Sequence, residues 1–246
     1  MSDAAFILGF PVEFKQLCLV YPPKVKEVVS NSKYTIYSRL LTFSQEEIED
    51  EYTKNGMELK DVLNPFEYIL NNSFHNKDFY GLAREAFKFF LHEDVIFLYE
   101  QKMVVIGNEE DLLKVKSVDD LRILREEDYF DFQNLIRRAI GCKEVEKPNP
   151  NEDPRVKRIK AKARYRDMIK AKSSKGLKLE STLASICCMG FGLNPLNIGE
   201  LSYAAVPLLI STFQEKEKYE LDIRSLLAGA SPAKVKPVYW IRNIDD

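Results

Sequence analysis

The residues with the clearest chemical character form a basic run late in the chain. Eleven lysines and arginines lie between positions 155 and 178, opposed only by Asp167, so this run carries a net charge of +10. The whole chain has 36 basic and 38 acidic residues, which leaves 25 basic and 37 acidic residues elsewhere and a net charge of −12 there. Charge segregated in this way separates modules or marks a contact surface.

Three interpretations of the basic run stay open. It can neutralise phosphates of a nucleic acid, it can bind an acidic partner that includes the acidic remainder of this chain, or it can be a solvated connecting helix. A dedicated nucleic-acid-binding protein is usually basic overall, and this chain is not, so nucleic acid is the less favoured partner. The candidate partner-binding residues of the run are Arg155, Lys157, Arg158, Lys160, Lys162, Arg164 and Arg166. In a helix over 154–172 these charges surround a thin apolar stripe, formed by Val156, Ile159, Ala163 and Met168.

Two aromatic residues near the C-terminus are the other candidates for partner binding. Tyr239 and Trp240, the only tryptophan, lie in a segment that we expect to be extended. Exposed aromatic side chains often anchor a partner protein. The alternative, which we favour for Trp240, is that this segment packs back on its own chain.

Catalytic and metal-binding patterns are scarce. The sequence has no phosphate-binding glycine loop, no paired cysteines at zinc spacing and no H-E-x-x-H. Neighbouring acidic residues, such as Glu46/Glu47 and Glu126/Glu127, occur at predicted helix starts, where negative charge complements the helix dipole. His75 and His92 fit the ends of predicted helices, where a histidine favours the dipole. We therefore expect a non-enzymatic protein without metal or cofactor.

The cysteines and the apolar segments indicate where the protein works. Cys18, Cys142, Cys187 and Cys188 predict free, mostly buried thiols in a reducing cytoplasm. No secretory signal or membrane span is expected, because the longest strongly apolar stretch, 204–210, has seven residues and contains Pro207. We expect a soluble cytoplasmic protein.

Composition and chain breaks predict the domain organisation. With 246 residues, 45% hydrophobic and 30% charged, the chain is that of an ordinary globular protein, and its 11 prolines and 10 glycines exclude collagen-like and disordered classes. Prolines at 148, 150 and 154 make one break, and the sequence SSKG at 173–176 makes another. We predict an N-terminal mainly helical module over 1–147, a break and basic connector helix over 148–176, and a C-terminal helical module with an extended tail over 177–246.

Periodicity predicts a mainly α fold with a small β-hairpin. Ser44 with Glu47 forms a capping box that opens a helix ending near Gly56, and Asn64 with Pro65 opens the next. Further helices are expected over 78–91, 126–140, 179–189 and 201–228, the helix over 179–189 being buried. The apolar segments 95–99 and 103–106 predict the hairpin, and the residues before Pro22 add a strand or two.

Several segments resemble proteins from the tail modules of phages and prophages of Gram-positive bacteria. They are FPVEF (10–14), VYPPKV (20–25), LTFSQEEIED (41–50), PNPNEDPRVK (148–157), LNIGELSY (196–203), IRSLLAG (223–229) and VYWIRN (238–243). The likeness covers most of the chain, and the class that it resembles most is the phage tail assembly chaperone.

The resemblance implies a mainly helical, non-enzymatic protein that acts in the host cytoplasm and is absent from the finished particle. Its implied partners are phage tail proteins, namely the tape-measure protein and the tail-tube subunits, and self-association is a further alternative. A structural subunit of the tail, neck or baseplate is the second interpretation, because the chain is longer than many such chaperones. Nucleic-acid binding through 155–178 is the third. No membrane partner is expected.

Overall fold

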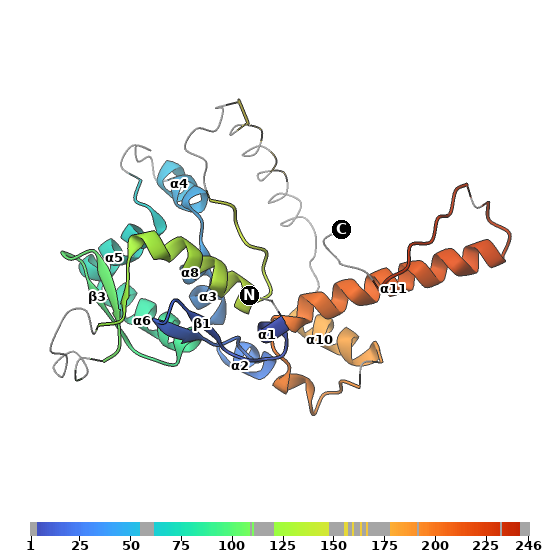
Figure 1. Cartoon of the computed structure of the whole chain (residues 1–246), viewed down its shortest axis with the longest axis horizontal. Coiled ribbons are helices and arrows are strands. Elements are labelled where there is room, and N and C mark those ends of the chain that lie inside the picture. Colours follow the sequence, from blue (N-terminus) through green and yellow to red (C-terminus); the bar gives the residue numbers. More distant parts are fainter. Residues whose placement is uncertain are drawn as a thin grey trace. The chain divides into compact units, whose positions relative to one another are not determined.

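We describe the fold from a computed structural model of the whole chain (Figure 1). The structure describes residues 4–54, 62–108, 110, 121–147, 155, 156, 159, 163, 166, 178–190, 192–231 and 233–241. The chain divides into two compact units, one made of 1–144 with 199–246 and the other of 145–198. The residues from 199 onwards therefore group with the N-terminal residues, a division that differs from the predicted modules 1–147, 148–176 and 177–246.

The helices and strands follow one another in the order that the sequence suggests. The first part holds α1 (Ala4–Ile7), β1 (Val12–Phe14), β2 (Cys18–Val20), α2 (Val25–Ser30), α3 (Tyr34–Thr42), α4 (Gln45–Lys54), α5 (Pro65–His75) and α6 (Lys77–Leu91). Then come β3 (Val95–Leu98), β4 (Met103–Ile106), β5 (Ile123–Leu124), α8 (Glu126–Ala139), α10 (Leu179–Cys188), the short 3₁₀-helix η3 (Ile198–Glu200) and α11 (Ala205–Leu227). The predicted fold class, mainly α with a small β part, is confirmed.

The two predicted helix starts are formed as expected. The Glu47 N–H donates to the Ser44 hydroxyl at 3.3 Å, and the Ser44 N–H donates to the Glu47 carboxylate at 2.8 Å. The Glu67 N–H donates to the side-chain oxygen of Asn64 at 2.9 Å, with Pro65 in the first helical turn. These bonds satisfy amides that the first turn of a helix leaves without partners, which fixes where α4 and α5 begin.

Two small antiparallel sheets accompany the helices. The predicted hairpin forms between β3 and β4, with Val95 opposite Ile106 and Leu98 opposite Met103. The strands expected before Pro22 are β1 and β2, which pair with each other. The short strand β5 also pairs with β4, and the sequence analysis did not predict it.

Aromatic side chains from several elements form the core of the N-terminal part. Phe87 of α6 and Phe132 of α8 are fully buried and stack with ring centroids 5.6 Å apart. Phe14 of β1 meets Phe132 edge-on, also at 5.6 Å. Each large aromatic side chain removes much apolar surface from water, so these rings fix how α6, α8 and the first hairpin pack. We call the described residues between 4 and 144 the body.

The chain before α11 is bound to the body by backbone pairing. The Val25 N–H donates to the Leu201 carbonyl at 2.9 Å, and the Tyr203 N–H donates to the Pro23 carbonyl at 2.8 Å. The buried Ser202 hydroxyl donates to the Phe6 carbonyl at 2.6 Å. Segments nearly 200 positions apart in the sequence are thus joined directly before α11 begins.

Two sequence predictions are wrong. The helix expected over 179–189 is present as α10, but among its residues only Ile186 is buried, because small and polar side chains cover most of its turns. The thiols are not mostly buried either, since Cys18 alone is buried, whereas Cys142 and Cys188 are exposed and Cys187 is half-buried. Within the described part of the chain, no helix combines the length and the apolar character needed to cross a membrane.

Candidate partner-binding surfaces

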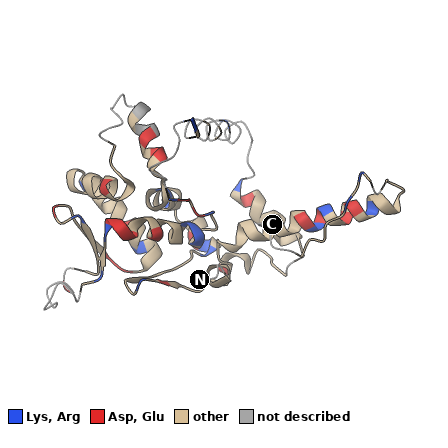
Figure 2. Cartoon of the chain, turned by 45° about the horizontal axis from the view of Figure 1, so that its top comes forward, with Lys and Arg blue, Asp and Glu red and all other residues tan. Residues whose placement is uncertain are grey.

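The helix α11 is 23 residues long and is buried only where it begins. Its buried side chains are those of Ala205 and Val206, in the first turn. Further along, Leu221 is 61% exposed and Leu227 is 84% exposed. The charged residues of α11 alternate in sign along the middle of the helix, as Figure 2 shows for the long helix labelled α11 in Figure 1. Apolar side chains among interleaved charges are typical of a helix that contacts another protein.

The described residues 233–241, here called the tail, return to α11. The Tyr239 ring meets the Tyr219 ring edge-on at 5.6 Å between centroids, and the Trp240 ring lies 6.2 Å from Tyr239. Trp240 is half-buried, whereas Tyr239 remains 56% exposed. Val238 and Ile241 are 51% and 61% exposed. The tail therefore touches its own chain and still presents apolar side chains, so both interpretations of Tyr239 and Trp240 describe part of its behaviour.

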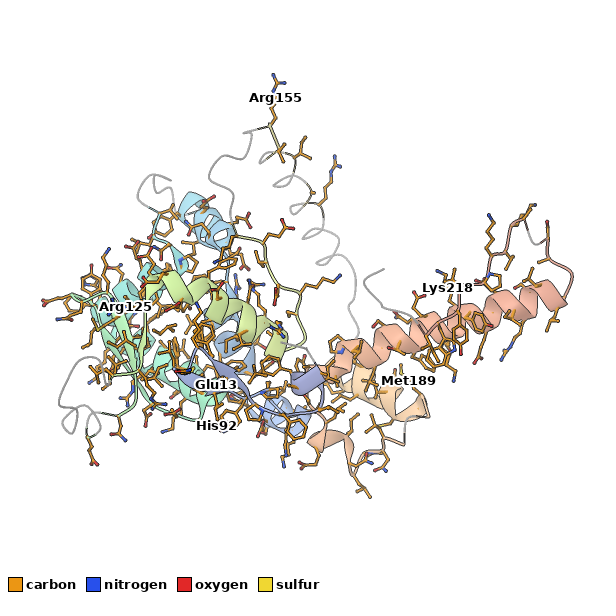
Figure 3. All side chains as sticks on the ribbon, viewed as in Figure 1. Glu13, His92, Arg125, Arg155, Met189 and Lys218 are labelled. Atoms are coloured by element: carbon orange, nitrogen blue, oxygen red, sulfur yellow. The ribbon has the colours of Figure 1, made fainter. Side chains whose placement is uncertain are left out.

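The basic run is described at five positions. Arg155, Val156, Ile159, Ala163 and Arg166 are all helical and exposed, and Figure 3 labels Arg155. Val156 and Ile159 of the expected apolar stripe are 41% and 67% exposed.

The other candidates in the run, Lys157, Arg158, Lys160, Lys162 and Arg164, lie outside the described residues, as does Met168. The structure assigns the basic run and the tail to different compact units. It therefore joins Tyr239 with Trp240 but does not bring the arginines of the run together with them.

An exposed aromatic cluster on the body was missed by the sequence analysis. Phe74 at the end of α5 is 60% exposed and stacks on Tyr99, which follows β3, at 4.7 Å between ring centroids. His75 meets the Phe74 ring edge-on at 5.0 Å. Phe74 falls outside the buried face of α5, and this departure from the helical period was the signal that could have identified it.

The histidines and acidic pairs take the structural roles that their positions predict. His92 ends α6 in the left-handed conformation, with φ at 58°, and its ring stacks on Tyr21 at 4.0 Å. Glu46 and Glu47 lie in the first turn of α4, and Glu126 and Glu127 in that of α8. The structure, over the positions that it describes, holds no group of three or more histidine, cysteine or acidic residues that could bind a metal ion.

Burial makes the thiols poor nucleophiles where it changes their acidity. It raises the pKa of Cys18 to about 12, so this thiol stays protonated at neutral pH. Burial also raises the pKa of Cys142. A raised thiol pKa lowers the thiolate fraction, which is the reactive form.

The remaining perturbed groups hold helices of the body together. The Tyr37 hydroxyl of α3 donates to the Glu85 carboxylate of α6 at 2.5 Å, and Lys33 binds the same carboxylate at 2.7 Å. Burial and the bond to Glu85 raise the pKa of Tyr37 to about 12. On α8, the Arg137 guanidinium donates to the Thr42 carbonyl at the end of α3. These contacts orient α3 against its neighbours, and none of them lies beside a second reactive group.

Comparison of this chain with protein-family models, with curated proteins and with solved structures found no match.

Proposed function

We propose that the protein is a non-enzymatic tail assembly chaperone of a phage or prophage. It would bind the tape-measure protein, tail-tube subunits or both in the host cytoplasm while the tail is built. The observation that carries the proposal is the exposed apolar surface of α11 and the tail, which includes Leu221, Leu227, Val238, Tyr239 and Ile241. Exposed apolar surface rimmed by charges supports protein binding over small-molecule chemistry.

The form of this surface suits a helical client. A client such as a tape-measure protein, which we expect to be long and helical, offers apolar stripes that need temporary cover before assembly. An exposed helix can cover such a stripe through residues spaced three and four apart. The charges at 215–218 and 220 then select partners of complementary charge, and they favour reversible association.

The first experiment is mass spectrometry of purified particles beside the lysate of infected or induced cells. A chaperone is expected in the lysate and absent from particles. A fixed copy number in particles would contradict the chaperone proposal and make the protein a structural subunit of the tail, neck or baseplate.

A second experiment tests the surface itself. The tape-measure protein of the same phage is co-expressed with this protein, and the soluble tape-measure fraction is measured. The combined change V238S/Y239S/I241S should lower that fraction, since it removes apolar side chains from the tail. Val29→Ser is the matched control, because Val29 on α2 is as exposed as Ile241 at 61% and lies away from the tail in sequence. An equal loss in both variants would contradict a role for the tail.

Nucleic-acid binding through the basic run is the alternative supported by the exposure of Arg155 and Arg166. It requires an affinity whose logarithm falls linearly and steeply with the logarithm of salt concentration. If Arg166 neutralises one phosphate, replacing it by Gln would lower that slope by about one unit. A binding curve that does not change with salt would eliminate this alternative.

A further inference from the structure

One side of α11 carries a regular seam of alternating spacing. Counted from Leu209, its members follow at intervals of four, three, four, three and four residues, which is the spacing of a coiled-coil seam. They are Leu209, Phe213, Lys216, Glu220, Ile223 and Leu227. The ends of the seam are apolar, and its centre holds one basic and one acidic residue.

The seam reads the same in both directions by chemical type. Its midpoint is Lys218, which Figure 3 labels on α11, and members at equal distances from it are matched in size or opposite in charge. In an antiparallel pair of α11 helices centred there, Leu209 lies opposite the partner's Leu227, Phe213 opposite the partner's Ile223, and Lys216 opposite the partner's Glu220. Two-fold symmetry repeats each of these contacts.

The structure leaves much of the seam open to a partner. Leu227 is 84% exposed, and the side chains of Lys216 and Glu220 are 43% and 45% exposed. Within one chain these two charges lie 3.9 Å apart, close to the limit of an ion pair. Tyr219, which receives the tail, points roughly 60° to 100° away from these two residues around the helix. The tail contact and the seam therefore occupy different sides of α11.

We infer that α11 is a self-association surface, and that two copies of this chain pair through antiparallel α11 helices centred on Lys218. Antiparallel pairing gives opposite charges at both central layers. Parallel pairing in the same register would place Lys216 against the partner's Lys216 and Glu220 against the partner's Glu220, which is repulsive. The charge pattern thus selects both the occupant and its orientation. This inference does not depend on the proposed chaperone function.

Charge reversal tests the pairing directly. Sedimentation velocity over a wide concentration range is expected to show a reversible monomer–dimer equilibrium for the full chain. Lys216→Glu alone and Glu220→Lys alone should each weaken dimerisation about tenfold or more, because each places like charges opposite each other twice in one dimer. The double variant K216E/E220K should dimerise like the wild type, since it restores opposite charges.

Mixing the two single variants separates pairing from effects within one helix. Each single variant has like charges at 216 and 220 of its own helix, but a heterodimer of the two has opposite charges at both central layers. The mixture should therefore form a heterodimer more tightly than either variant forms a homodimer, with helix content by circular dichroism as a folding control. A mixture that stays monomeric would overturn the inference, as would a wild-type chain that stays monomeric at every concentration.

An apolar pair of variants checks the ends of the seam. Leu227→Glu should weaken dimerisation about tenfold or more, because it faces the partner's Leu209 with a charge. Leu221→Glu is the matched control, since Leu221 is also exposed on α11 but is turned about 100° from Glu220 of the seam. Equal dimerisation of both variants would contradict the assignment of the seam.

Discussion

The body and α11 are stabilised in different ways, although they belong to one compact unit. The body buries complete aromatic side chains, such as Phe87 and Phe132, between helices and strands. In α11, the buried side chains are those of Ala205 and Val206 at its start. Burying one large apolar side chain contributes about 1.5–3 kcal/mol, whereas one charged i,i+4 pair on a helix contributes about 0.2–0.5 kcal/mol.

This difference indicates a division of work. The body forms its own core, and the chain at 201–203 joins α11 to that core. Beyond its first turns, α11 depends on its own backbone hydrogen bonds and on whatever binds to it. A helix of this kind gains stability on association, so its partners affect it more than they affect the body.

The largest expected effect comes from emptying the aromatic core. Phe132→Ala should lower the free energy of unfolding by about 3–5 kcal/mol, because it removes a fully buried ring that stacks on Phe87. Chemical denaturation followed by circular dichroism measures the loss. Leu221→Ala on α11 is the control and should change stability by less than about 0.5 kcal/mol. Similar losses in both would break the distinction between the body and α11.

The next effect concerns the joint between α8 and the start of α11. Gly141 has φ at +74°, and a Cβ atom placed there would lie 2.7 Å from Cγ of Pro207 and 3.0 Å from the Ala204 carbonyl. Gly141→Ala should therefore destabilise the protein by about 2–3 kcal/mol, through backbone strain and the steric clash. Gly9→Ala isolates the strain, because Gly9 has a similar φ of +82° with open space around it. A smaller loss at Gly9, measured by thermal unfolding, is the expected result.

A smaller effect is expected from the cap of α5. Asn64→Ala should cost about 1 kcal/mol, since it removes the oxygen that accepts the Glu67 N–H and the amide that binds Glu126 at 2.9 Å. Asn64→Ser should recover part of the loss, because serine keeps a capping oxygen. Urea unfolding curves of the two variants provide the test. The start of α11 has no side-chain cap, so its first turn relies on the joint to the body.

The smallest effect is a pH dependence near the same joint. Glu200 binds Lys24 at 2.8 Å and Lys26 at 2.5 Å, and these hydrogen bonds lower its pKa from 4.5 to about 2. Because the folded pKa is depressed, the stabilisation is present above about pH 4.5 and is lost as the pH falls through 2. Glu200→Gln should be less stable than the wild type at pH 6, and the two proteins should converge as the pH falls to 2. A difference that does not change with pH would contradict this role of the ion pairs.

The sequence predicts those parts of the fold that depend on neighbouring residues. The starts of α4 and α5 follow from Ser44 with Glu47 and from Asn64 with Pro65, which interact over three positions or fewer. The hairpin of β3 and β4 follows from two apolar segments joined by a short polar turn. These elements were predicted correctly because the determining residues are close in the sequence.

The features that the sequence analysis missed depend on distant contacts. Ile123 and Leu124 are too short a segment to show alternation, and they become a strand only because β4 offers a free edge. The burial of Cys18 and the exposure of Cys142 depend on which helices cover them. The exposed surface of α11 was similarly hidden, because its apolar residues suggest burial until the packing around them is known.

The pairing of residues 23–25 with 201–203 has a consequence for synthesis on the ribosome. The residues that hold Pro23, Val25 and the Phe6 carbonyl are made only after about four-fifths of the chain has been translated. Closing so long a loop in an unstructured chain costs about 4–5 kcal/mol by its length alone, and prior folding of the intervening helices reduces that cost. The emerging chain therefore gains a folded body first, and the N-terminal segment is fastened only when translation is nearly complete. Any partner that binds α11 meets a body that was formed before it.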